Sequence, residues 1–207
     1  MNFANVGKLR VKQMSNGDRF VLMPFYEGKP ELLLPKNLLK QPYNARSGHR
    51  HVREVLLAKG NNKLSYNVFL KPILIKGFFE NEYRQLMPSH EARIISELLS
   101  HGFKAETPLG VYFFNIKKWG TKTDWPAFGG LAGYLITKKV EGKRASTADA
   151  KSLEQQLKQA GFVTSDVNPK HVLNARHVIK NKSGLFIVDA ESFQTRDFIN
   201  RRDSRRS

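Results

Sequence analysis

The segment "TSDVNPKHVLNARHVIKNKSGLFIVDAES", residues 164–192, decides the fold predicted for this chain. It begins with a polar loop that carries Asp166 and continues with a short apolar strand. The turn "KNKSG", residues 180–184, leads into a second apolar strand that ends at Asp189. Two apolar runs separated by a turn rich in Asn, Ser and Gly are typical of a β-hairpin. The segment therefore predicts a hairpin that lies between two carboxylates.

The composition limits the classes of protein to which the chain can belong. It has 207 residues, of which 40% are hydrophobic and 11% aromatic, enough to bury the core of one domain or of two lobes. There is no cysteine, which excludes disulfides, zinc–thiolate sites and a cysteine nucleophile. The net charge of +17 fits either a solvated basic surface or anionic partners such as nucleotides, nucleic acid or an anionic membrane surface.

No segment has the pattern of a membrane anchor or a signal peptide. No apolar run approaches the roughly 20 residues that a membrane-spanning helix needs. The amino-terminal stretch "MNFANVGKLRVKQMSNGDRF" lacks the apolar core of a secretory signal. We therefore expect a soluble protein, made in the cytosol, with no stable membrane insertion.

The chain before the hairpin is rich in predicted strands. Short apolar runs bounded by Gly, Pro and charged residues predict strands within residues 18–25, 30–36, 52–60, 64–71, 72–77, 109–116 and 133–140. Pro72 is expected to separate two of them, and residues 41–50 are expected to form a loop.

Two helices are also predicted before the hairpin, the first between the strands at residues 72–77 and 109–116 and the second after the strand at 133–140. The first begins near Ser89 and ends at Gly102, with an apolar stripe of Ile94, Ile95, Leu98 and Leu99. The second has a capping box from Ser146 to Asp149 and ends at Gly161. The order of elements predicts an α+β, two-lobed fold with a cleft at a connector within residues 140–143.

The two carboxylates at the ends of the hairpin suggest a divalent cation. Magnesium prefers oxygen ligands and binds in proteins through one or two carboxylates together with substrate phosphates. The alternative for each acid is structural: Asp166 caps a turn, and Asp189 pairs with a lysine.

With these acids in place, residues 52–193 resemble a protein-kinase-like fold. The run "ILIK" ending at Lys76 resembles the strand that presents the phosphate-binding lysine, and "FLK" ending at Lys71 is the alternative. The segment from His90 onwards resembles the helix whose glutamate, here Glu91, pairs with that lysine. The run "YLITKKVEG", which contains Lys138 and Val140, looks like the strand and hinge against which adenine stacks.

The resemblance also implies roles for the acids. In "SDVNPKHVL", Asp166 stands in the place of the catalytic aspartate, and His171 replaces the expected asparagine. In "FIVDAES", Asp189 stands in the place of the metal-binding aspartate of an Asp-Phe-Gly motif. Glu191 shares the face of Asp189 on an extended chain, so it is a further candidate ligand.

The chain also departs from the kinase pattern. It has no GxGxxG loop, and the segment around Gly60 is the candidate cover for the phosphates. His171 and the Asp-x-Glu strand end are similar to bacterial lipopolysaccharide kinases of the Kdo/WaaP and InaA-like kind. Only residues 190–207 follow Asp189, so we expect no room for an activation segment. A kinase-like chain reduced in this way resembles the minimal protein kinases that bacteria inject into host cells.

The resemblance implies one kinase-like domain over residues 1–195. Its first lobe covers about residues 1–139, its hinge 140–143 and its strongly reduced second lobe 144–195, followed by a basic tail at 196–207. We expect a phosphotransferase that uses ATP with Mg²⁺ or Mn²⁺, a minimal Ser/Thr protein kinase whose substrate is a protein, as in a secreted bacterial effector. The alternatives are a lipopolysaccharide kinase and a basic pseudokinase that binds nucleic acid or a partner protein.

Overall fold

The computed structural model describes residues 4–6, 9–40, 43–45, 52–57, 66–74, 90–114, 131–164, 173, 175–190 and 193–195. The chain divides into two compact units. Unit 1 comprises Met1–Ser89 and Thr107–Lys139, and unit 2 comprises His90–Glu106 and Val140–Ser207. Both units combine strands with helical segments, which confirms the α+β class. The division assigns residues 90–106 to unit 2, whereas the predicted lobes assign them to the first lobe, so the kinase-like lobe boundaries remain a prediction.

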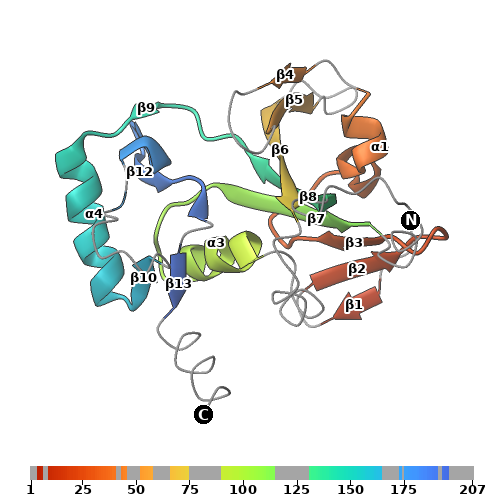
Figure 1. Cartoon of the computed structure of the whole chain (residues 1–207), viewed down its shortest axis with the longest axis horizontal. Coiled ribbons are helices and arrows are strands. Elements are labelled where there is room, and N and C mark those ends of the chain that lie inside the picture. The colour runs from red at the N-terminus through yellow and green to blue at the C-terminus, as the bar shows by residue number, and fades with distance from the viewer. Residues whose placement is uncertain are drawn as a thin grey trace, which may run out of the picture. The chain divides into compact units, whose positions relative to one another are not determined.

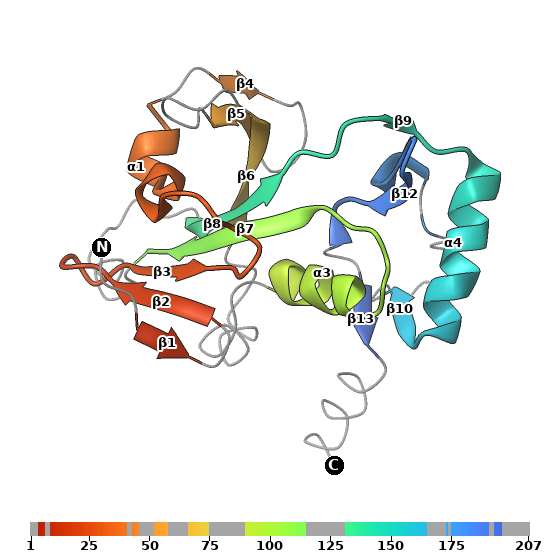
Figure 2. The same cartoon turned by 180° about the vertical axis from the view of Figure 1, so that it is seen from behind.

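Unit 1 is built on an antiparallel sheet (Figures 1 and 2). Its described part has eight strands in the order β1-β2-β3-β7-β8-β6-β5-β4. The long strands β6, β7 and β8 lie at its centre, with β8 paired on both sides. The strands are β1 (Ala4–Val6), β2 (Leu9–Gln13), β3 (Arg19–Leu22), β4 (Tyr43–Ala45), β5 (Arg53–Leu57), β6 (Tyr66–Leu74), β7 (Thr107–Phe113) and β8 (Leu131–Lys138).

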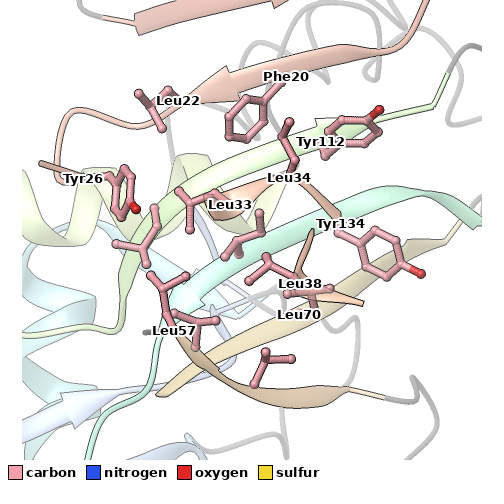
Figure 3. Packing of buried hydrophobic residues seen from close by; sticks show 14 residues of the cluster. Phe20, Leu22, Tyr26, Leu33, Leu34, Leu38, Leu57, Leu70, Tyr112 and Tyr134 are labelled. Carbon is pink, nitrogen blue, oxygen red and sulfur yellow. The ribbon is translucent and has the colours of Figure 1, made fainter. Parts of the chain in front are cut away.

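One face of this sheet carries the core of unit 1. Two short helices, η1 (Pro30–Leu33) and α1 (Pro35–Leu38), add their leucines to it. Figure 3 shows Leu33, Leu34 and Leu38 among the side chains of the sheet, including Leu70 of β6 and Phe20 of β3. All five are at most 2% exposed. Each such side chain contributes about 1.5–3 kcal/mol by burial, so the helices are held by packing rather than by their own length.

The strand predicted at residues 30–36 is wrong, because this segment forms η1 and α1. Pro30 and Pro35 stand at the first helical positions, where the missing N–H breaks no hydrogen bond. The leucines that follow are buried on one helical side instead of alternating between two faces of a sheet.

Two further local predictions for unit 1 are wrong. Residues 64–77 were expected to form two strands separated at Pro72, but β6 continues through this residue to Leu74. The partner strand β5 begins at Arg53, which pairs with Leu70, so Pro72 lies beyond the end of β5, and among the described strands it pairs with β8. A missing N–H is tolerated at such a position. Within the expected loop 41–50, residues 43–45 form β4, a strand that exists through its pairing with β5.

Unit 2 contains two α-helices, one short 3-10 helix and several short strands in its described part. Three strands form a sheet in the order β12-β11-β9, and β10 pairs with β13. The helix α4 contacts β10, and α3 contacts β13. The elements are α3 (His90–Ser100), β9 (Lys143–Arg144), α4 (Thr147–Gln159), β10 (Phe162–Thr164), η4 (Ala175–His177), β11 (Val178–Asn181), β12 (Gly184–Ile187) and β13 (Phe193–Thr195).

The helices and the hairpin of unit 2 confirm their predictions. In α3, Ile94, Ile95 and Leu98 are fully buried, and Gly102 follows with a φ of 81°. The predicted capping box starts α4, and the hairpin is β11 paired with β12. No helix among the described residues is long and apolar enough to cross a membrane.

Candidate functional site

Asp189 lies just beyond the end of β12, which is held on both sides. On one side β11 pairs with β12, with Val178 opposite Ile187. On the other side, the N–H of Ile187 donates to the carbonyl oxygen of Lys104, and the N–H of Glu106 donates to the carbonyl oxygen of Ile187, both at 2.9 Å. Ile187 is fully buried between these neighbours. The strand end that precedes Asp189 is therefore a firmly supported part of unit 2.

The backbone of Asp189 has an unusual conformation. Its φ is 63°, and no other non-glycine residue in the described ranges has a positive φ. The left-handed region costs most L-residues roughly 1–2 kcal/mol, and aspartate is among those that tolerate it best. The N–H of Asp189 donates to Oε1 of Glu106 at 2.8 Å, and Glu106 is 1% exposed. A hydrogen bond to a carboxylate is stronger than one between neutral groups, so this contact offsets the cost.

The side chains at this turn point in different directions. The carboxylate of Asp189 is 48% exposed, while the next residue, Ala190, is fully buried. Oδ2 of Asp189 lies 3.8 Å from Nε2 of His177 in η4. The main chain of His177 is also fixed here, because its carbonyl oxygen accepts the N–H of Val188 at 2.8 Å. The result is an accessible carboxylate on an ordered backbone, beside an imidazole.

An exposed carboxylate of this kind fits the predicted metal. Magnesium is held in nucleotide sites by one or two protein carboxylates, with phosphates and water as the other ligands. Asp189 can supply one of them. Asp166, His171 and Glu191, predicted to act with it, lie outside the described residues. Among the residues that are described, no group of three or more His, Cys, Asp or Glu side chains forms a metal site.

Glu91, the predicted partner of the phosphate-binding lysine, is buried in unit 2. It stands in the first turn of α3 and is 5% exposed. A buried carboxylate needs a hydrogen bond or a cation to offset its lost hydration. Its place in the first turn is also favourable, because the amino-terminal end of a helix carries partial positive charge.

Lys71, one of the two candidate lysines, is buried in the sheet of unit 1. It lies on β6 opposite Leu135 of β8, which in turn lies opposite Val111 of β7. These three side chains form a row across the sheet, on the face opposite the one that carries Leu70. Lys71 is 8% exposed, whereas Leu135 and Val111 are at most 1% exposed. Lysine is seldom buried unless its ammonium has a partner, so Lys71 is an unusual residue in an otherwise apolar row. The other candidate, Lys76, lies outside the described residues, as does Gly60.

The predicted hinge begins at the end of β8, where the chain is fixed by polar contacts. Oε1 of Glu54 accepts a hydrogen bond from the side-chain amide of Asn67 at 2.8 Å. The same oxygen forms an ion pair with Nζ of Lys139, also at 2.8 Å. The N–H of Lys139 also donates to the carbonyl oxygen of Asn67. The predicted nucleotide contacts differ in exposure: Lys138 is exposed and Val140 is half-buried.

Three residues of these sites were not predicted from the sequence: Glu106, His177 and Glu54. Glu106 had one detectable signal, because it is an acid between the end of one helix and an apolar strand in "GFKAETPLGVYF". His177 and Glu54 lie in segments whose local pattern predicts only turn or strand. Glu54 contacts Asn67 and Lys139, which lie in other segments of the sheet, and His177 contacts Asp189 across the β11–β12 turn. The local hydrophobic periodicity of the sequence does not reveal either contact.

Comparisons with known proteins leave the family open. No family model matches the chain, and no curated protein matches it. Among solved structures, it is similar to the Lpg2603 kinase of Legionella pneumophila bound to IP6, with a TM-score of 0.44 and 12% identity. The match covers 94% of this chain and 64% of that kinase. A likeness of this degree carries no argument about activity, so the proposal below depends on the residues of this chain.

Proposed function

We propose that the chain is an ATP-dependent phosphotransferase of the protein-kinase-like class. The observation that carries this proposal is Asp189: an accessible carboxylate at a strand end, in a left-handed conformation held by a buried glutamate. Backbone held in a sparsely populated region is concentrated at functional sites. An acid at this place is the residue type that a magnesium–nucleotide site requires.

The order of elements supports the same class. In protein kinases the phosphate-binding lysine is on the third strand, and its glutamate partner is on the helix that follows. Here β4, β5 and β6 are consecutive antiparallel strands, β6 carries Lys71, and Glu91 is in the first turn of the next described helix, α3. The buried position of Lys71 on β6 supports it for the phosphate-binding role, while the alternative, Lys76, lies outside the described residues.

In this proposal each residue has one task. Lys71 binds the phosphates of the nucleotide, and Glu91 corresponds to the glutamate that the kinase resemblance assigns to such a lysine. Asp189 holds the metal, with Glu191 and His171 as further candidate ligands, and Asp166 orients the acceptor hydroxyl and accepts its proton. Gly60 contributes backbone to the cover of the phosphates, while Lys138 and Val140 line the base of the nucleotide. Magnesium or manganese, when bound, neutralises phosphate charge as it develops.

We propose a Ser or Thr hydroxyl of a protein as the acceptor. The net charge of +17 suits an acidic docking surface on such a substrate. It also suits the phosphorylated sugars of lipopolysaccharide, the second candidate acceptor, and the phosphates of nucleic acid, which a non-catalytic protein of this charge would bind.

A thermal-shift titration tests the nucleotide site. The melting temperature is measured with ATP alone, with magnesium alone and with both. A ligand at 100 times its dissociation constant adds about 2.7 kcal/mol of stability, so a clear rise with ATP and magnesium together is expected. Lys71→Met should remove the shift, whereas Lys151→Met, an exposed lysine on α4, should keep it. No shift in the unmodified chain at millimolar nucleotide contradicts the proposal.

Transfer of label from γ-labelled ATP tests the reaction and the acceptor. The protein is incubated with magnesium or manganese and with either host-cell lysate or purified lipopolysaccharide. Label in a few protein bands that Asp189→Ala abolishes supports the protein kinase. Label confined to saccharide identifies the second acceptor. Absence of transfer, together with nucleic-acid affinity that falls by orders of magnitude between about 50 and 200 mM salt, indicates the binding protein.

A further inference from the structure

Glu106 is a buried acid to which the proposed reaction gives no task. Its side chain is 1% exposed, so it cannot touch a nucleotide or an acceptor. It nevertheless contacts the main chain of the proposed metal ligand, since its Oε1 accepts the N–H of Asp189 at 2.8 Å. The two residues are 83 positions apart in sequence and both belong to unit 2.

The contact continues a ladder of main-chain hydrogen bonds. The N–H of Ile187 donates to Lys104, and the N–H of Glu106 donates to Ile187. The next donor along β12 on this side is the N–H of Asp189. Instead of a backbone carbonyl, it meets the Glu106 carboxylate, at the residue where the backbone turns to a φ of 63°. Glu106 thus holds the strand by its main chain and the turn by its side chain.

The turn determines where the carboxylate of Asp189 lies. After it, Ala190 is fully buried while the Asp189 side chain is half exposed and 3.8 Å from His177. If the N–H of Asp189 lost its acceptor, the left-handed conformation would lose the contact that offsets its cost, and an extended conformation would redirect the side chain. A buried carboxylate is costly to keep, which favours a role that an apolar side chain could not fill.

We infer that Glu106 is a positioning residue that orients Asp189 toward the metal of a bound nucleotide. This inference depends on the proposed function and adds to it a residue outside the kinase-like motifs. The carbonyl oxygen of a glutamine can accept the same N–H in a weaker, neutral hydrogen bond, so a glutamine at this position keeps the acceptor and loses only the charge. Groups that orient a metal ligand change metal affinity or activity by about 10- to 100-fold when removed.

The test compares Glu106→Gln and Glu106→Leu in the full chain. The matched control is Lys104→Met, two residues away, because the Lys104 side chain supports the same hairpin by donating to the carbonyl oxygen of Ser183 and packing over the ring of Phe186. Three quantities are measured: hydrogen exchange of the Asp189 amide by NMR, binding of Mn²⁺ in the presence of a non-hydrolysable ATP analogue by electron paramagnetic resonance, and the melting temperature.

We expect Glu106→Leu to expose the Asp189 amide to exchange and to weaken Mn²⁺ binding by about 10- to 100-fold. Glu106→Gln should retain the protected amide and most of the affinity, and Lys104→Met should alter stability alone. An Asp189 amide that stays protected in Glu106→Leu overturns the inference, as does unchanged Mn²⁺ affinity in that variant. If the unmodified chain binds no Mn²⁺ with nucleotide, the proposed function is wrong and the metal role of Glu106 is overturned with it. In that case amide exchange still shows whether the contact with Asp189 exists.

Discussion

The hydroxyl of Tyr112 in β7 donates a 2.6 Å hydrogen bond to Oδ2 of Asp18, in the turn between β2 and β3. Both residues are at most 8% exposed. Asp18 is also bonded within its own turn, because the side-chain amide of Asn16 donates to the same Oδ2 at 2.7 Å. The contact therefore fixes the β2–β3 hairpin on the central part of the sheet.

We expect Tyr112→Phe to destabilise unit 1 by about 1–3 kcal/mol, because a buried carboxylate loses a donor. The matched control is Tyr134→Phe, since Tyr134 lies opposite Tyr112 in the pairing of β7 with β8. Within the described chain the Tyr134 hydroxyl makes no hydrogen bond, so this variant should cost clearly less. Urea unfolding of both variants measures the difference, and equal losses would contradict the assigned contact.

The same tyrosine predicts a loss of stability at alkaline pH. Burial, with the hydrogen bond to Asp18 and its charge, raises the pKa of Tyr112 above the ordinary value of 10.0. A raised pKa means that the folded state favours the neutral phenol. Its contribution is fully present below pH 10 and is lost as the pH rises through 10 toward the folded-state pKa. The stability difference between the unmodified chain and Tyr112→Phe should therefore shrink between about pH 9 and 11, measured by urea unfolding at each pH.

The start of α4 predicts a loss of stability in acid. The hydroxyl of Ser146 and then the ammonium of Lys180 lower the pKa of Asp149 below 3.8. A lowered pKa means that this contribution is present above pH 3.8 and is lost as the pH falls through the folded-state value. In Asp149→Asn, the free energy of unfolding should therefore depend less on pH between about pH 2 and 6. If the pH dependence in this range were unchanged, Asp149 would not act in this way.

The cap of α4 gives a separate prediction. Ser146→Ala should cost about 0.5–2 kcal/mol at neutral pH, because the helix loses its cap.

Gly133 in β8 is required by close packing of the sheet. A Cβ at this position would overlap the carbonyl oxygen of Tyr112 and lie 3.1 Å from Cα of Phe113. Because both obstacles are backbone, Gly133→Ala should destabilise by about 3 kcal/mol or more. The control is Gly102→Ala, where φ is 81° and no atom lies within 4 Å of the added carbon. Gly102→Ala should be destabilised by about 1–2 kcal/mol, the cost of placing a residue with a Cβ in a left-handed backbone conformation. Thermal and urea unfolding rank the two, and a reversed order would contradict the packing described here.

Glu54 is expected to stabilise the end of β8, where the predicted hinge begins. Glu54→Leu removes the acceptor shared by Asn67 and Lys139, both partly buried, and should cost about 1–3 kcal/mol. Glu54→Gln keeps the hydrogen bond to Asn67 but loses the ion pair, so its loss should be smaller. If the two variants unfold at the same urea concentration, the charge of Glu54 contributes nothing here.

Local patterns in the sequence were sufficient to predict the helices and the hairpin of unit 2. The capping box at Ser146, the glycines after α3 and α4, and the turn at residues 180–184 each involve residues only a few positions apart. The same kind of signal failed at residues 30–36, where a run of leucines between two prolines fits a strand and a pair of short helices equally well. Packing against the sheet decided between them.

The sequence by itself determined the α+β class, the hairpin and the place of Asp189 at its end. Only the tertiary structure decided the strand order, the burial of Lys71 in an apolar row and the contact between Glu106 and Asp189. The physical reason is the range of the interactions. Caps and turns form between neighbours in the chain, and residue type reports them directly. A hydrogen bond across 83 residues forms only after folding has brought the two segments together, so no local pattern encodes it.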